Sequence, residues 1–255
     1  MSSSAKRALR ILDAIGRASR PLGVTDIARM LSLPPGTVFR SLDALVRADL
    51  IARYQASSRY VLGGAAERLR RSLIARFRMR DVVLPYLRQL ASISGETASL
   101  HVRLGWHGLR IASAPGTAEL TNVPPLGEAR PLGEYYAGRA MLAFLGDDEI
   151  TRYGLWAAGR GATDRVEIGG TRHQAFALGD PEFKQAAPIA LPIRGNTGQA
   201  IAALAIEGPV FAPDGDAANL AAWREIAGHV EALARTQPLL FENPFGHLDP
   251  DRIAL

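Results

Sequence analysis

A chain of 255 residues, 47% of them hydrophobic, is long enough to fold into two modest domains or one large one. It has no cysteine, which excludes disulfides, thiol nucleophiles and thiolate metal sites, and no apolar run reaches the roughly 18–20 residues of a membrane-spanning helix. The N-terminus only faintly resembles a signal peptide, because Asp13 and Arg17 interrupt its apolar positions and no small-residue cleavage site follows. We therefore expect a cytoplasmic protein that does not bind a membrane.

The charge is unevenly distributed along the chain. Residues 1–80 hold 16 Lys and Arg against 5 Asp and Glu, a net charge of +11. The other 175 residues hold 14 against 20, a net charge of −6. A basic first third followed by an acidic remainder indicates an N-terminal module that meets a polyanion.

Two helices are predicted before residue 32. Over residues 6–18 apolar side chains recur at helical spacing with polar residues on the other face, and Pro21 and Gly23 end the pattern. Thr25 has a side chain suited to an N-cap, so a short second helix is expected over 26–31.

A third helix is predicted over residues 34–48. Pro34 and Pro35 form a stiff entry to it, since the first amides of a helix are unpaired and a proline costs little there. The apolar face of this helix is expected to contain Val38, Leu42, Leu45 and Val46. Two short β-prone runs, 51–55 and 59–62, then flank a polar tripeptide and indicate a hairpin. Three helices followed by a small hairpin predict a winged helix-turn-helix arrangement.

After the hairpin the pattern indicates one basic helix and then a mixed α and β region. Residues 65–80 are helical and basic with one apolar seam, so they are predicted to link two domains. Further helices are expected over 81–94, 136–145, 147–155 and 216–236, and strands over 97–104, 109–114, 174–178, 189–194 and 199–207. Pro85 is expected to be tolerated in the first turn of its helix, and the apolar tail after Thr236 is expected to pack on its own domain or on a neighbour.

The sequence contains no catalytic motif that we can identify. It has no Gly-rich phosphate loop of either standard form, no HExxH and no GxSxG. His101 and His107, six residues apart, make at most a weak metal pair, and Glu96 and Glu119 are interpreted as ordinary surface charges. We expect no catalytic residue, no metal site and no cofactor.

A helix-turn-helix motif places the N-terminal end of its second helix in the major groove of DNA. Here that end is the start of the third predicted helix, where Arg40 can contact guanine or a phosphate. The free amides of Gly36, Thr37 and Val38 can bind a phosphate at the positive end of the helix dipole. The predicted DNA-binding residues are Thr25, Gly36, Thr37, Phe39, Arg40, Ser41, Arg53 and Arg59. The alternative is a small helical bundle with a solvated polar face, which the charge of +11 and the hairpin disfavour.

Several segments resemble the IclR family of bacterial transcriptional regulators. They are KRALRILDAI, GVTDIARMLSLPPGTVFRSLDALVRADLIAR and the hairpin end RYVLG, and further along PLGEYYAGRAMLAFL, FALGDPEF and PIALPIRGNTGQAIAALAIEGP. The resemblance covers about residues 5–236. It implies a winged-helix domain, a linker helix and a GAF-like α/β domain that binds a small metabolite, in dimers or tetramers that bind operators.

The recognition helix departs from the family pattern at its start. Members usually have Pro-Lys-Ser-Thr, whereas this chain has Pro34-Pro35-Gly36-Thr37 and so lacks a cation and a hydroxyl. More of the DNA recognition is therefore expected from Thr37, Phe39, Arg40 and the hairpin.

The second domain also departs from the family in its pocket. The residues similar to the family's effector-binding positions are Glu119, Asn122, Arg130, Tyr136, Ala137, Gly179, Pro188, Ala205 and Glu207. Small hydroxyl and acidic residues common at some of these positions are replaced, which argues against the simplest carboxylate effectors. Tyr135 and Tyr136 favour a larger ligand, for instance an aromatic one; the alternative is that both rings are ordinary core side chains.

The resemblance implies an α+β protein of three parts. These are a winged helix-turn-helix DNA-binding domain over 1–64, a linker helix over 65–80, and a GAF-like α/β domain for effector binding and oligomerisation over 81–255. We predict a ligand-responsive regulator of a catabolic operon that binds a double-stranded DNA operator as a homodimer or homotetramer. Two copies would place their helices 34–48 in successive major grooves of a roughly palindromic site. Two alternatives stay open: an architectural DNA-binding protein whose second domain only assembles subunits, and a metabolic enzyme with a vestigial winged domain.

Overall fold

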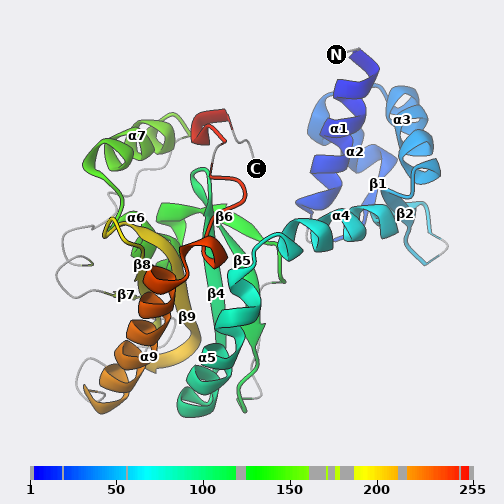
Figure 1. Ribbon diagram of the computed structural model, residues 1–255. Helices are drawn as coiled ribbons and strands as arrows, with labels where there is room; N and C mark the ends of the chain where they lie inside the picture. Colours follow the sequence, from blue (N-terminus) through cyan, green and yellow to red (C-terminus); the bar gives the residue numbers. More distant parts are fainter. Residues whose placement is uncertain are drawn as a thin grey trace. The chain divides into compact units, whose positions relative to one another are not determined.

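The computed structural model describes residues 3–18, 20–55, 57–118, 125–160, 171, 176–178, 187–211, 217–246 and 248–252. The chain divides into two compact units, Met1–Ala75 and Arg76–Leu255 (Figure 1). No helix among the described residues is both long and apolar enough to cross a membrane.

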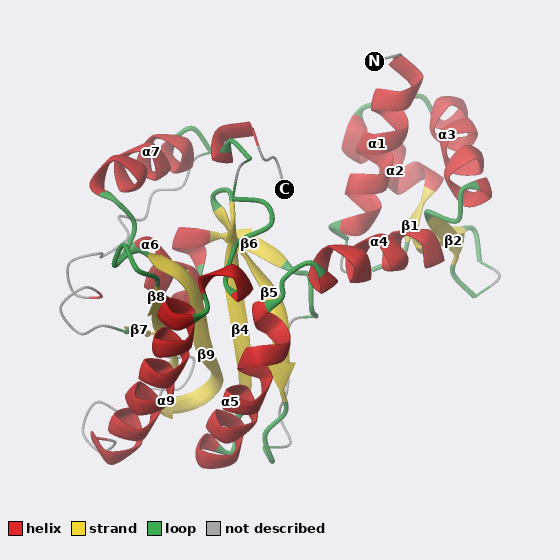
Figure 2. Ribbon diagram, in the orientation of Figure 1, coloured by secondary structure: helices red, strands yellow, loops and turns green. Residues whose placement is uncertain are grey.

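The first unit is a winged helix-turn-helix domain, as predicted. Its helices are α1 (Ser3–Gly16), α2 (Val24–Leu31), α3 (Pro35–Arg47) and α4 (Gly64–Ala75). Its strands β1 (Leu22–Gly23), β2 (Ile51–Arg53) and β3 (Arg59–Leu62) form an antiparallel sheet in the order β1-β3-β2 (Figure 2). The strand β1 was not expected from the sequence, because two residues are too few to show an alternating pattern.

A small apolar core holds the first unit together. Ile11 of α1, Ile27 of α2, Val38 and Leu42 of α3 and Ile51 of β2 are buried at its centre. Burying such a side chain fully contributes about 1.5–3 kcal/mol, so these few residues dominate the stability of the unit. The prediction that Val46 shares this face is wrong: its side chain is 37% exposed.

The start of α2 differs from the prediction that Thr25 is its N-cap. The helix begins at Val24 with Gly23 as N-cap, and the amide of Gly23 donates to Asp26 Oδ2 at 3.0 Å. A carboxylate three residues after the cap satisfies one of the unpaired donors at a helix start. Thr25 therefore lies in the first turn, with an exposed side chain.

The predicted single linker helix over 65–80 is also wrong in its extent. The helix α4 ends at Ala75, and a new helix, α5 (Met79–Ser94), begins four residues later. Phe77 lies in the break and is buried in the second unit. Since α5 starts at Met79, Pro85 lies in its interior and not in its first turn.

The second unit is built on one antiparallel sheet of six strands in the order β6-β5-β4-β9-β8-β7. Its strands are β4 (Thr97–Leu104), β5 (His107–Ala114), β6 (Ala129–Pro131), β7 (Ala177–Leu178), β8 (Ala187–Arg194) and β9 (Ala200–Phe211). In Figure 1 the helices α5 and α9 (Ala217–Thr236) lie in front of the sheet and α6 (Tyr136–Leu142) lies behind it. A further helix, α7 (Asp147–Ala158), follows α6. The predicted α+β class is confirmed: a helix-turn-helix domain precedes an α/β domain.

The face of the sheet that carries α6 forms a dense core. Small side chains of β8 and β9, among them Ala190, Ala203 and Ala205, pack against α6 and the single-turn helix η1 (Leu132–Glu134) before it. Because alanine side chains are short, α6 can approach the sheet closely. Ala137 is fully buried in this layer.

The C-terminal tail packs on its own unit, which was one of the two expectations for it. The ring of Phe245 lies 5.8 Å from that of Phe77, measured between centroids. Trp106 Nε1 donates to Asp251 Oδ1 at 2.7 Å, and Arg152 donates to Asp251 Oδ2 at 2.5 Å.

Two glycine substitutions should have opposite effects on the stability of this unit. A Cβ on Gly138 of α6 would collide with the carbonyl oxygen of Leu132 and lie 2.6 Å from Tyr135 Cε1, whereas a Cβ on Gly154 of α7 meets nothing within 4 Å. We expect Gly138→Ala to lower the free energy of unfolding by about 1–3 kcal/mol. Gly154→Ala is the matched control and should raise it by about 0.5–1 kcal/mol. Urea unfolding checks both; equal effects would contradict the tight contact between η1 and α6.

Candidate DNA-binding surface and candidate effector pocket

The N-terminal end of α3 is an exposed surface with one cation and one aromatic ring. Phe39 is 54% exposed and Arg40 is also exposed, while Val38 and Leu42 hold the opposite side of the helix in the core. Within the described residues Arg40 makes no ion pair and no side-chain hydrogen bond. Its guanidinium is therefore available to a ligand outside the chain. A Cβ at Gly36 would meet nothing within 4 Å, so the backbone there is open to close approach.

The prediction that the first amides of this helix are free is wrong for two of the three. The amides of Thr37 and Val38 donate to the carbonyl oxygen of Pro34, at 2.9 and 3.1 Å. The hydroxyl of Ser41 donates back to the carbonyl oxygen of Thr37 at 3.1 Å. These groups complete the first turn of α3, from which Phe39 and Arg40 project as exposed side chains, while Thr37 is half-buried.

The two arginines of the hairpin have different surroundings. Arg59 donates to the carbonyl oxygen of Pro21 at 3.0 Å and to Asp26 Oδ2 at 3.2 Å, so it ties β3 to the start of α2. The amide of Gly23 lowers the pKa of Asp26, and the neighbouring arginines add to this effect. Arg53, at the end of β2, is exposed and has no ion pair within the described part of the chain. Arg53 is thus the more available cation.

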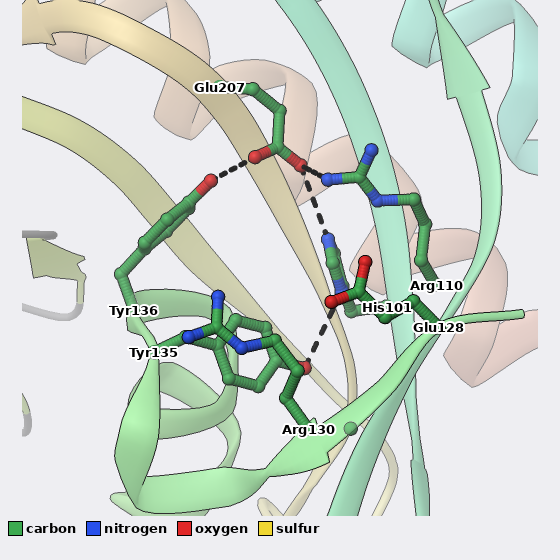
Figure 3. Close-up of a pocket in the computed structure, with 8 residues that line it drawn as sticks. His101, Arg110, Glu128, Arg130, Tyr135, Tyr136 and Glu207 are labelled. Carbon is green, nitrogen blue, oxygen red and sulfur yellow. Dashed lines mark hydrogen bonds and ion pairs between the residues drawn. The ribbon is translucent and has the colours of Figure 1, made fainter. Parts of the chain in front are cut away.

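In the second unit, the register of three strands gathers polar side chains on one face of the sheet. On β4, Ser99 and His101 stand opposite Ala205 and Ala203 of β9. His101 also stands opposite Arg110 of β5, after a bulge in the pairing. Because side chains alternate between the two faces of a strand, Glu207 of β9 shares the face of Ser99 and His101. Figure 3 shows the side chains of His101, Arg110 and Glu207 converging with those of Tyr135 and Tyr136.

The convergence forms a partly open pocket with a volume of about 30 Å³. A water molecule needs roughly 10–15 Å³ of such volume, so the pocket has room for about two waters. Its lining residues are His101, Gly108, Arg110, Glu128, Arg130, Tyr135, Tyr136 and Glu207.

Glu207 is the centre of the pocket's hydrogen bonds. Its Oε1 accepts from Ser99 Oγ at 2.5 Å and from Arg110 Nη2, and its Oε2 accepts from the Tyr136 hydroxyl. The exposed fraction is 10% for the Glu207 side chain and 3% for that of Arg110. The two side chains form a buried ion pair. Such a pair is stable only when the remaining hydrogen-bonding positions of both groups are satisfied, which Ser99 and Tyr136 do for the carboxylate.

The pocket fixes the protonation states of its members. Burial by itself would raise the pKa of Glu207, but the hydrogen bonds from His101 and Ser99 and the positive charge of Arg110 lower the pKa to about 2. Glu207 is therefore ionised at neutral pH. Burial raises the pKa of Tyr136, and the nearby Glu207 carboxylate raises it further, so this phenol stays protonated and donates.

His101 is neutral at neutral pH because burial lowers its pKa more than Glu207 raises it. Its Nε2 lies 2.9 Å from Ser99 Oγ and 3.5 Å from Glu207 Oε1, and its Nδ1 lies 3.4 Å from the Tyr135 hydroxyl. The tautomer with a proton on Nε2 satisfies these contacts, since Nδ1 then accepts from Tyr135.

Tyr135 forms one wall of the pocket. A Cβ at Gly108 would coincide with the Tyr135 hydroxyl, so this strand position has to be glycine for the ring to lie where it does. Arg130, opposite Gly108 in the sheet, places its guanidinium carbon 5.5 Å from the centroid of the Tyr135 ring. A cation over the face of a tyrosine ring is an attractive arrangement.

Ser99, His101 and Glu207 superficially resemble a hydrolytic triad. In such a triad the serine and the acid contact opposite nitrogens of the histidine. Here both face Nε2, and the serine hydroxyl donates directly to the carboxylate. A carboxylate with a pKa of about 2 is also a weak base at neutral pH. The arrangement is suited to binding through hydrogen bonds and not to acyl transfer. Among the described residues, no cluster of His, Asp and Glu is placed to hold a metal ion.

The predicted effector-binding residues divide into three groups. Arg130, Tyr135, Tyr136 and Glu207 line the pocket. Ala137 and Ala205 are buried in the layer behind it, and Pro188 lies on β8 and does not line it. Glu119, Asn122 and Gly179 lie outside the described residues.

The sequence analysis did not identify five residues of the site: Ser99, His101, Gly108, Arg110 and Glu128. One signal could have found two of them. Along 97–104 polar residues alternate with apolar ones, so Ser99 and His101 share one face of a strand that a packed sheet buries. Arg110 has no such signal, because the bulge before His101 decides which residue it faces.

A winged-helix domain followed by an α/β domain with a pocket is the arrangement of a helix-turn-helix regulator that carries a separate second domain. The comparison with protein families agrees. The IclR helix-turn-helix domain matches residues 4–54, and the C-terminal domain of the bacterial transcriptional regulator IclR matches residues 72–231. The chain belongs to the IclR family and is a DNA-binding transcriptional regulator of that family.

Its relatives are similar over most of their length. The HTH-type transcriptional regulator XynR of Escherichia coli (strain K12) is 25% identical over 232 residues, which cover 87% of this chain and 91% of that protein. The crystal structure of an IclR family transcriptional regulator from Brucella abortus has a TM-score of 0.70 at 20% identity and covers 91% of this chain and 92% of its own. The crystal structure of an IclR homolog complexed with 4-hydroxybenzoate from Microbacterium hydrocarbonoxydans has a TM-score of 0.68 at 21% identity and covers 90% and 98%. These two structures support the fold.

Glu207 should make the free energy of unfolding depend on pH in the acid range. Its folded pKa of about 2 lies below the ordinary value of 4.5, so the stability it contributes is present above pH 4.5 and is lost as the pH falls toward 2. We expect Glu207→Gln to lower the free energy of unfolding by about 1–3 kcal/mol at pH 7, the contribution of hydrogen bonds to a charged group. The difference from the wild type should shrink as the pH falls from 4.5 to 2.

Urea unfolding between pH 2 and pH 7 measures this difference. Glu134→Gln is the matched control, because it removes the same charge from an exposed residue outside the pocket. It should change the stability by less than about 0.5 kcal/mol. A difference between the wild type and Glu207→Gln that stays constant over this pH range would show that Glu207 is not held as an ionised group.

Proposed function

We propose that this chain is a ligand-responsive regulator of a catabolic operon. It binds operator DNA through the α3 end of its first unit and a small metabolite in the pocket of its second. The observation that carries the proposal is the Glu207 pocket, where an ionised carboxylate, a buried arginine and two tyrosines surround a small open volume. A site with convergent polar groups and shifted pKa values is the arrangement expected for ligand binding.

The DNA-binding part of the proposal rests on family membership and on the surface of the first unit. Arg40 and Phe39 project from the N-terminal end of α3, and Arg53 is exposed on the hairpin. A net charge of +11 over residues 1–80 attracts a polyanion over a distance of about 10 Å at moderate salt. Arg59 is engaged within the domain, so we assign it a supporting role.

The ligand part of the proposal has support from the place of Tyr136. This residue is the first of α6, and its hydroxyl donates to Glu207. We propose that Tyr136 releases Glu207 when a ligand of the size of the 4-hydroxybenzoate named for the Microbacterium hydrocarbonoxydans homolog enters, because such a ligand exceeds room for about two waters. Such a ligand would bind one arrangement of α6 better than another, which is the condition for coupling a binding site to a distant activity.

The proposal also covers the location of the regulator, its assembly, its operator and the absence of catalysis. The regulator acts in the cytoplasm as a homodimer or homotetramer on a double-stranded operator of two-fold symmetry, because a two-fold protein matches a two-fold site. It uses no cofactor and catalyses no reaction.

A titration of metabolites against the protein–operator complex tests the response to ligand. We expect at least one small catabolite to change operator affinity about 5-fold or more, the usual size of an allosteric effect. Fluorescence anisotropy of labelled operator DNA measures it. If ligands bind the second unit but none changes the affinity, the second unit serves only assembly, and the architectural alternative is favoured.

Arg40→Ala should weaken operator binding. Removing a contact between Arg40 and a base costs about 1–3 kcal/mol of binding free energy. Removing a contact with a phosphate instead reduces the slope of log affinity against log salt concentration by about 1. Arg88→Ala is the matched control, because it removes one exposed arginine from α5 of the second unit. Anisotropy titrations at several salt concentrations distinguish the cases. Unchanged affinity and salt dependence in Arg40→Ala would place the DNA-binding surface elsewhere.

A further inference from the structure

The charges that line the Glu207 pocket cancel. Arg110 and Arg130 contribute two positive charges and Glu128 and Glu207 two negative ones, among the described residues that line it. His101 is neutral, and both tyrosines are protonated. The pocket is therefore electrically balanced before any ligand enters.

The charges at the bottom of the pocket are buried, whereas those at its mouth are reached by water. Arg110 is 3% exposed and is committed to Glu207, whose carboxylate it meets at Oε1. Arg130 is exposed and Glu128 half-buried, so water screens both of them. The deep part of the pocket decides the charge of a bound ligand, because water does not screen charges there.

A ligand with a net negative charge meets two obstacles at this site. Its carboxylate would have to share Arg110 with Glu207, which places two carboxylates next to each other, and like charges at that distance disfavour each other. It would also leave one buried charge without a counter-ion, which is the costly state for a buried group. A neutral ligand with hydrogen-bond donors and acceptors meets neither obstacle.

We propose that this pocket selects ligands without net charge, such as amides, phenols, ureides or zwitterions, and that Glu207 is the residue that excludes simple carboxylates. This inference rests on the proposed function, in which the pocket holds the effector. It makes Glu207 a specificity-determining residue: the internal carboxylate occupies the arginine that an anionic ligand would need.

Two pairs of probes of equal shape test the proposal. They are propanamide with propanoate and 4-hydroxybenzamide with 4-hydroxybenzoate, where each pair differs by one charge and the two pairs differ in size. Dissociation constants are measured by isothermal titration on the full chain without DNA, for the wild type and for Glu207→Gln. Glutamine keeps the size of the side chain and one of the two acceptor oxygens that Ser99 and Tyr136 use, and gives the pocket one net positive charge.

We expect Glu207→Gln to bind at least one of the two carboxylates about tenfold or more tightly than the wild type does, equivalent to about 1.4 kcal/mol. The affinity for the amides should change far less, since they carry no charge. Carboxylate binding that is no tighter in Glu207→Gln overturns the proposal, including the case in which neither protein binds either carboxylate. Wild-type binding of a carboxylate as tight as that of its amide also overturns it.

Two more variants keep the test decisive. Glu128→Gln adds the same charge at the mouth without touching the buried ion pair, and should shift carboxylate affinity in the same direction by a smaller factor than Glu207→Gln does; a shift as large or larger would overturn the assignment to Glu207. If Glu207→Gln does not fold, the comparison of each amide with its carboxylate on the wild type still decides, because equal affinities overturn the proposal. Glu134→Gln makes the same change at an exposed residue that does not line the pocket, and should leave the affinity unchanged. Because binding is measured without DNA, failure here differs from failure of the proposed function, in which ligands bind but operator affinity does not respond.

Discussion

The second unit depends on one constraint: a carboxylate buried on β9 must be paired. Glu207 and Arg110 come from strands on either side of β4, so their ion pair spans three neighbouring strands. The pair is stable only because Ser99 and Tyr136 supply further donors, and this requirement brings the start of α6 against the sheet. The shape of the pocket thus follows from the need to satisfy a buried charge.

The close packing on this face of the sheet follows from the position of the start of α6 against it. Tyr135 can lie over β5 only because Gly108 has no side chain, and η1 can turn into α6 only because Gly138 leaves room for the carbonyl oxygen of Leu132. The short side chains of the alanines on β8 and β9 let α6 lie close to these strands. Specific small residues therefore give the pocket walls their position, and the polar residues give it its chemistry.

The arginines of the first unit have two kinds of surroundings: some bond within the domain, and others are exposed at its surface. Arg59 joins β3 to the start of α2 through Pro21 and Asp26, whereas Arg40 and Arg53 project from the surface. The sequence does not distinguish these arginines, since all three follow predicted helix or hairpin patterns. Only the antiparallel pairing of β1 with β3, which places Arg59 beside Asp26, separates them.

The sequence by itself determined much of the local structure, namely the first three helices and the hairpin of the first unit and most elements of the second, because periodicity acts between near neighbours. The family followed from the resemblance of whole segments. The sequence also indicated four of the lining residues: Arg130, Tyr136 and Glu207 through the resemblance, and Tyr135 as a neighbouring aromatic side chain. Only the tertiary structure decided that Arg110 pairs with Glu207, 97 residues away, because a β-bulge sets the register between β4 and β5. It likewise decided the break of the linker helix at Phe77, since burial of that ring in the second unit outweighs the continuous helical pattern. Contacts between distant residues depend on register and burial, which no local pattern contains.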